Sequence, residues 1–359
     1  MASLSEPKDG FSSPSFEPSS SATSSTYAIP GLTPLSDLYH RFSAWRKNLD
    51  LPAPGTVENL TKEVKNTHLT NFFFDGARAD LTKGLSANPA FQVTHSFALG
   101  SQTVAPSYNF GAVYLTDNVF LQGGMDHEGS LNARFNQGWG RGHVSKFQGS
   151  FSSTPGHSML QIEHDYQGRD YSVNLKAMNP SPVDLTGMYI GNILQSVTKH
   201  LALGVEGLYQ RPQPDLSDLA LSYLVKYTGG ENPSLPWIGT AQLSPTQGLL
   251  QTTYWQKLSE KLEVAADLQL IANSQRRDAI ATLGARWDLR MATFRAQLDS
   301  TGKVSALLEQ RFAPSFSFLV AGEIDHFRNA AKVGVGVMIE SSSLTPEEMS
   351  MAAMPHPPQ

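Results

Sequence analysis

Apolar and polar residues alternate along most of this 359-residue chain, from about Phe72 to Ile339. In residues 262–270 the even positions are apolar, whereas glutamate, aspartate and glutamine occupy three of the odd positions. Residues 171–177 and 219–227 follow the same rule. Because successive side chains of a strand point to opposite faces, this pattern predicts strands with one apolar and one polar face.

Short runs of Gly, Pro, Asn and Ser separate these segments and predict the turns between strands. Examples are Asn179–Pro182, Gly229–Pro233 and Ser300–Gly302. The glycine-rich run Gly138–Gly142 lies between two alternating segments, so we interpret it as a hairpin loop. The segments are roughly 8–11 residues long, which is the length of a tilted strand that crosses a bilayer.

The composition favours a membrane barrel over a soluble sheet. Charged residues make up only 16% of the chain and the net charge is -5, while the mean hydropathy is -0.26. The polar rows contain mostly Asn, Gln, Ser, Thr and Gly, as in a water-filled lumen. Aromatic residues stand near the strand ends, which suits the level of the lipid headgroups. We therefore predict an all-β transmembrane barrel, closed because an open sheet edge in lipid would leave backbone groups unpaired.

The chain divides into four expected regions. Residues 1–32 and 341–359 are expected to be disordered, 33–70 to form two helices, and 71–340 to form the barrel. The first helix, Leu35–Lys47, lies outside the barrel in this interpretation, and its aromatic stripe is expected to dock on the outer barrel wall or on a partner. The second runs from Thr56 to about His68, with an apolar stripe formed by Val57, Leu60 and Val64. We expect this second helix to lie inside the lumen.

No catalytic or metal-binding motif is present in the sequence. The chain contains no cysteine, and neither a phosphate-binding loop nor a nucleophile elbow occurs. His157 and His164 have no third ligand nearby in the sequence. We therefore expect no enzyme activity, no catalytic residue, no metal, no cofactor and no nucleic-acid partner.

Two segments carry a family resemblance. Pro54–Val64, followed by Leu81–Lys83, resembles the channel-forming subunit of the mitochondrial outer-membrane protein translocase, the TOM complex, in its fungal form. The last alternating segment is similar to the mitochondrial β-signal, a motif of polar, glycine and two hydrophobic positions. The residues matching that motif are Lys332, Gly334, Val337 and Ile339.

The resemblance implies a multi-pass barrel of the mitochondrial outer membrane, related in fold to the voltage-dependent anion channel. It implies nineteen strands. Dividing the alternating region at its predicted turns, guided by this resemblance, gives about the same number. It also implies a conduit for precursor polypeptides that carry presequences. The implied partners are a central single-span receptor, small single-span subunits and a second copy of the channel. The sequence shows no secretory signal, which is consistent with entry from the cytosol. The N-terminal segment contains Glu6 and Asp9 and no Arg before Arg41, which argues against a cleaved matrix-targeting peptide.

Mitochondrial presequences are basic, so a lumen that passes them needs dispersed acidic groups that bind weakly. Strand parity predicts a set of acidic residues on the lumen face, which we take as presequence-binding candidates. They are Glu206, Glu263, Asp267, Asp288, Glu309, Glu323 and Asp325. Lumen charges could instead pair with the second helix through Lys62 and Lys65.

Two alternatives stay open on the sequence alone. A metabolite-conducting porin of the voltage-dependent anion channel type has the same strand pattern, although the two helices and the negative net charge argue against it. A soluble β-rich interaction scaffold would need a second protein layer over its apolar rows.

Overall fold

The computed structural model describes residue 46 and residues 49–342, apart from 102, 103, 141, 155, 157, 182, 183, 214, 231–233 and 274–276. The helix expected at Leu35–Lys47, except Arg46, and residues 1–32 and 343–359, expected to be disordered, lie outside these residues. Residues 341 and 342, also expected to be disordered, instead end the last strand. The chain from Leu51 onward forms one unit. No helix among the described residues is long and apolar enough to cross a membrane.

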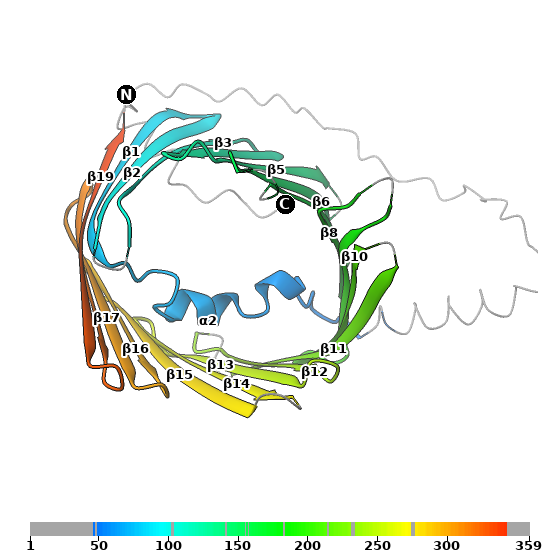
Figure 1. The fold of residues 1–359 in the computed structure, drawn as a ribbon. Coiled ribbons are helices and arrows are strands. Elements are labelled where there is room, and N and C mark those ends of the chain that lie inside the picture. The colour runs from blue at the N-terminus through cyan, green and yellow to red at the C-terminus, as the bar shows by residue number, and fades with distance from the viewer. Residues whose placement is uncertain are drawn as a thin grey trace, which may run out of the picture. The chain divides into compact units, whose positions relative to one another are not determined.

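Nineteen strands form one closed sheet in the described part of the chain, as predicted (Figure 1). Strands that follow one another pair antiparallel, and β1 closes the ring by pairing with β19 in parallel. The strands are β1 (Gly76–Ala87), β2 (Ala90–Gly100), β3 (Ser107–Leu115), β4 (Val119–Asp126), β5 (Leu131–Gly140), β6 (His143–Phe151), β7 (Met159–Gln167), β8 (Tyr171–Met178), β9 (Gly187–Ser196), β10 (Leu201–Gln213), β11 (Leu216–Gly229), β12 (Trp237–Ser244), β13 (Leu249–Ser259), β14 (Leu262–Ala272), β15 (Arg277–Asp288), β16 (Ala292–Asp299), β17 (Lys303–Ala313), β18 (Phe316–Asp325) and β19 (Ala330–Ser342).

The strand registers sort the alternating residues onto two faces, which we call the polar face and the apolar face. Glu263 and Asp267 of β14 lie on the polar face, together with their cross-strand partners. On the apolar face large side chains are exposed: Leu283 by 55%, Ile324 by 52% and Val333 by 62%. Within the described residues no second layer covers these apolar rows, which argues against the soluble scaffold.

A short segment precedes the barrel and packs against the polar face. It contains a 3-10 turn, η1 (Val57–Asn59), and a helix of six residues, α2 (Lys62–Thr67). The prediction of one continuous helix from Thr56 to His68 is therefore wrong. The break lies at Thr61, whose φ and ψ of -107° and 16° are not helical.

The break has a packing cause. Leu60 packs with Leu194 and Leu224 of β9 and β11, whereas Val64 packs with Trp255 and Ala265 of β13 and β14. These are two separate parts of the wall. A change of direction between Leu60 and Val64 lets the predicted apolar stripe reach both.

The C-terminal end of α2 rests on a glycine of the wall. His68 follows α2 and contacts Gly284 of β15 so closely that a Cβ at position 284 would overlap the imidazole carbon Cδ2. The absence of a side chain at position 284 therefore leaves the space that His68 occupies.

We expect the substitution Gly284→Ala to destabilise the barrel by about 1–3 kcal/mol, because the new methyl group must displace His68. The melting temperature of the purified chain in detergent measures this. Gly123→Ala is the matched control, since nothing lies within 4 Å of a Cβ there. Equal melting temperatures for both variants would contradict close packing of His68 on the wall.

Candidate functional site

The strand registers bring the acidic residues singled out from the sequence to one face. All seven lie on the polar face: Glu206 in β10, Glu263 and Asp267 in β14, Asp288 in β15, Glu309 in β17, and Glu323 and Asp325 in β18. Their strands occupy one part of the ring, β10 to β18. Binding of presequences by these residues stays a prediction.

Some of these acids are already paired with arginines. The guanidinium Nη2 of Arg286 lies 2.9 Å from the carboxylate Oδ2 of Asp288. Arg311 Nε lies 3.6 Å from Glu309 Oε1. Such pairs hold an arginine and a carboxylate in place and lower the net charge that a passing peptide meets.

Other acids have no cationic partner. The carboxylate of Asp267 accepts hydrogen bonds of 3.2 Å from Gln251 Nε2 and 3.1 Å from Gln269 Nε2, both neutral donors. Glu323 accepts a hydrogen bond of 3.2 Å from Ser305 Oγ. Among the described residues, Asp267, Glu323, Glu206 and Glu263 form no ion pair within 4.0 Å. These four carboxylates are not held by a direct ion pair and are the best candidates for binding basic groups.

Asp325 has a structural contact that the sequence did not reveal. Its Oδ1 accepts hydrogen bonds from the backbone N–H groups of Phe327 at 3.1 Å and Arg328 at 2.9 Å. It therefore caps the turn between β18 and β19. This role accounts for an aspartate at this position without a ligand.

The densest charge cluster joins the segment before the barrel to β6 and β7. The ammonium of Lys146 lies 2.6 Å from Glu58, 3.1 Å from Glu163 and 2.7 Å from Asp165. Glu163 and Asp165 are only 4% and 5% exposed. The amide of Asn174 donates hydrogen bonds to both. Buried carboxylates need such partners, because an unpaired buried charge is strongly unfavourable.

Sequence reasoning missed this cluster because it depends on cross-strand register. Glu163 lies directly opposite Lys146, and Glu58 reaches Lys146 from 88 residues away. The hydrogen bond from Lys146 lowers the pKa of Glu58 below its usual 4.5, against the opposing effect of partial burial. In the described chain neither Lys62 nor Lys65, the residues considered for this role, forms an ion pair.

Side chains of the wall also hold the backbone before η1. Ser196 Oγ donates to the carbonyl of Pro52 at 2.7 Å, Lys226 Nζ to Pro54 at 3.0 Å and Ser172 Oγ to Gly55 at 2.6 Å. Carbonyls in a stretch without secondary structure have no intrahelical donor, so these contacts satisfy them. The first part of the segment is thereby fixed to β8, β9 and β11.

The last part of the segment is fixed by apolar contacts. Leu69 is 1% exposed and packs with Leu307 of β17 and Ala321 of β18. The backbone N–H of Leu69 donates to Gln297 Oε1 at 2.7 Å, and the Arg295 guanidinium lies 4.1 Å from the centre of the Phe72 ring. Burial lowers the pKa of His68 below its usual 6.5, so this imidazole is neutral at pH 7.

The four positions that match the β-signal divide between the two faces. Lys332 and Gly334 of β19 lie on the polar face, opposite Glu323 and Ala321 of β18. Val337 and Ile339 have the opposite parity and lie on the apolar face. The motif therefore describes an ordinary two-faced strand with one glycine on its polar side.

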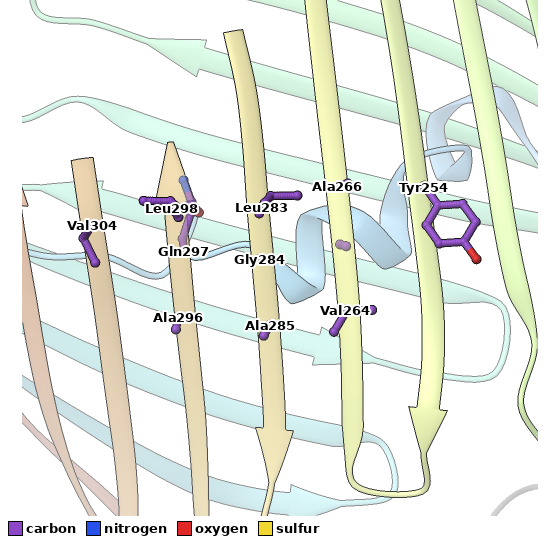
Figure 2. Close-up of a pocket in the computed structure, with 11 residues that line it drawn as sticks. Tyr254, Val264, Ala266, Leu283, Gly284, Ala285, Ala296, Gln297, Leu298 and Val304 are labelled. Atoms are coloured by element: carbon purple, nitrogen blue, oxygen red, sulfur yellow. The ribbon is translucent and has the colours of Figure 1, made fainter. Parts of the chain in front are cut away.

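A hollow of about 510 Å³ lies on the apolar face (Figure 2). Ala285 and Ala296 lie side by side in the row next to Leu283 and Leu298, Ala266 lies opposite Leu283 on the neighbouring strand, and α2 lies on the other side of the strands. The walls are mostly hydrocarbon and carry no charged group. This hollow therefore offers no charged chemistry.

Comparison with known proteins identifies the family. Residues 53–334 match the eukaryotic porin family. The mitochondrial import receptor subunit tom40 of Neurospora crassa is 42% identical over 331 residues, 89% of this chain and 92% of the relative. The Saccharomyces cerevisiae TOM40 is 38% identical, covering 85% and 83%, and the human TOM40 homolog 31%, covering 80% and 79%.

The chain belongs to the Tom40 family of eukaryotic porins. Its relatives are named for mitochondrial import, which favours the import channel over a metabolite porin. A porin family is a family of channels, in agreement with the expectation of a channel rather than an enzyme.

The charge cluster around Lys146 should contribute to the free energy of unfolding of this Tom40-family chain. We expect Lys146→Met to cost about 3 kcal/mol or more, because Glu163 and Asp165 would lose the ammonium while buried. Glu58→Gln should cost at most about 1 kcal/mol, since the Glu58 side chain is 55% exposed. Denaturant unfolding of the purified chain measures both. Equal losses would mean that the wall carboxylates do not depend on Lys146.

Proposed function

We propose that the chain spans the mitochondrial outer membrane as a barrel, with the apolar face against lipid. The exposed apolar rows support this, because hydrocarbon is the solvent that suits them. Aromatic rings near the strand ends support it as well. The Trp237 ring centre lies 5.2 Å from that of Tyr227 and 5.8 Å from that of Tyr254. Amphipathic rings of this kind prefer the headgroup level.

Insertion makes a simple prediction. The chain should stay in the membrane pellet when mitochondria are extracted with alkaline carbonate, because only an integral protein resists this treatment. A peripheral mitochondrial protein in the same sample is the control and should be released. Release of this chain together with the control would overturn the membrane barrel and support a soluble particle.

The segment from Leu51 to Phe74 lies in the lumen in this proposal. Its contacts are with the polar face, the face that a water-filled passage requires, and its ribbon runs across the ring of strands (Figure 1). A lumen partly occupied by a fixed segment leaves a narrower passage than the ring alone would give.

The barrel then serves as the conduit through which precursor polypeptides enter mitochondria. Family membership is the observation that carries this function, since the relatives are mitochondrial import subunits. The polar wall suits such cargo, because acids without cationic partners can attract a basic presequence and release it again. Following the resemblance, the partners are a central single-span receptor, small single-span subunits and a second copy of the channel.

Planar-bilayer recordings with a basic presequence peptide test the acidic wall. The triple variant Glu263→Gln, Asp267→Asn, Glu323→Gln should need about tenfold more peptide for half-maximal block. This follows if each of the three charge contacts contributes roughly 0.5 kcal/mol. The block should also weaken with added salt, because salt screens exposed charges.

A matched control separates local binding from net charge. The triple variant Asp117→Asn, Asp184→Asn, Glu260→Gln removes the same charge from three exposed turns. We expect the block of this control variant to match that of the unmodified chain. Equal block in all three proteins would contradict presequence binding by the polar face.

A further inference from the structure

The contact between β1 and β19 closes the barrel. It is the one parallel pair among the described strands, and its register runs from Gly76 opposite Gly334 to Gly84 opposite Ser342. All other neighbours are joined along the chain by a turn or loop. The two strands of this seam come from opposite ends of the barrel sequence, so no short connection holds them together.

An aromatic residue just before β1 covers two glycines of β19. A Cβ added at Gly334 would overlap the carbonyl oxygen of Phe74 and lie 3.0 Å from two atoms of its ring. At Gly336 a Cβ would lie 2.9 Å from the Phe74 ring carbon Cζ. The two glycines thus form a niche on the polar face that the Phe74 side chain fills.

The residues before Phe74 are held on the far side of the seam. Leu69 packs with Leu307 of β17 and Ala321 of β18, and Phe72, Phe73 and Phe74 pack against the same cluster. After Phe74 the chain continues into β1 at Gly76. Residues 69–74, which we call the strap, are therefore packed on β17–β19 and bonded covalently to β1.

We propose that the strap holds the β1–β19 seam closed and sets its register, with Gly334 and Gly336 as its docking niche. Gly334 would then have a role in the finished barrel besides its place in the motif that resembles a β-signal. This proposal does not rest on the import function.

The niche selects one register because its neighbours on the polar face carry long side chains. A slip of two residues keeps every side chain on its own face, so alternation alone does not prevent it. Such a slip would bring the Phe74 ring onto Lys332 or Met338, which flank the two glycines on that face. Only the native register presents two adjacent positions without a side chain.

The absence of cysteine from the sequence permits a clean test of the seam. Lys83 and Ser341 are cross-strand partners near the end of the seam farthest from Phe74, and both are exposed. Cysteines at these two positions should form a disulfide under copper phenanthroline in the full-length chain in detergent. We expect Phe74→Ala to slow this cross-linking severalfold, because the strap loses its anchor.

Gly336→Ala is the decisive variant, since position 336 is not one of the four motif positions. It should slow cross-linking as Phe74→Ala does, because the new methyl group expels the ring. In the Phe74→Ala background the same change should have a much smaller effect, since the closest contact is gone and only the Leu319 Cβ, 3.3 Å away, stays near the new methyl group. Gly322→Ala, with no atom within 4 Å of the added Cβ, should cross-link like the parent.

Two results would overturn the proposal. One is unchanged cross-linking in both Phe74→Ala and Gly336→Ala. The other is a double variant whose defect is the product of the two single defects, which would mean that Gly336 and Phe74 act separately. The melting temperature of each variant shows whether slower cross-linking comes from general misfolding instead. Phe74→Leu retains an apolar side chain and should restore part of both readouts, so loss of both in this variant would also count against the strap.

Discussion

The whole fold depends on the need to pair every backbone N–H and C=O group of a sheet that has no edge. Strands joined by turns alternate in direction, so in a ring of nineteen the first and last must run the same way. The parallel register of β1 with β19 is therefore a consequence of the odd strand number. This seam is where the ring lacks a covalent turn, and it is where the residues just before β1 pack most closely on glycine.

The two-faced strand is also why the wall can carry an internal segment. On the polar face small residues leave room: Gly284 for His68, and Gly334 and Gly336 for Phe74. The apolar face also has close contacts of this kind, since a Cβ at Gly229 would overlap the Trp237 ring. Whether a glycine tolerates a methyl group therefore depends on its immediate neighbours, and Gly123 and Gly322 have none within 4 Å.

The sequence predicted the two faces and the positions of the acidic residues, because period-two alternation is a local signal. The strand number of nineteen was implied by the family resemblance. Residues 262–270 alone specify which of Glu263 and Leu262 faces the polar side. Contacts that depend on register were out of reach. The ion pair between Lys146 and Glu58 joins residues 88 apart, and the pattern of neither segment indicates the other. The break at Thr61 was missed for a similar reason, since the stripe of Val57, Leu60 and Val64 is regular, whereas the wall clusters that receive Leu60 and Val64 are separate.

Hydrogen-bond partners decide which charges on the polar face belong to the structure and which are open to cargo. Glu163 and Asp165 are buried against Lys146, so a basic peptide would have to displace an ammonium to reach them. Asp267 is held only by the neutral amides of Gln251 and Gln269, which orient its carboxylate and leave its charge uncompensated. A passage needs sites of the second kind, because a ligand held by several buried ion pairs would not leave. The polar face thus combines a rigid part that anchors the internal segment with a part where charge is oriented yet free to bind.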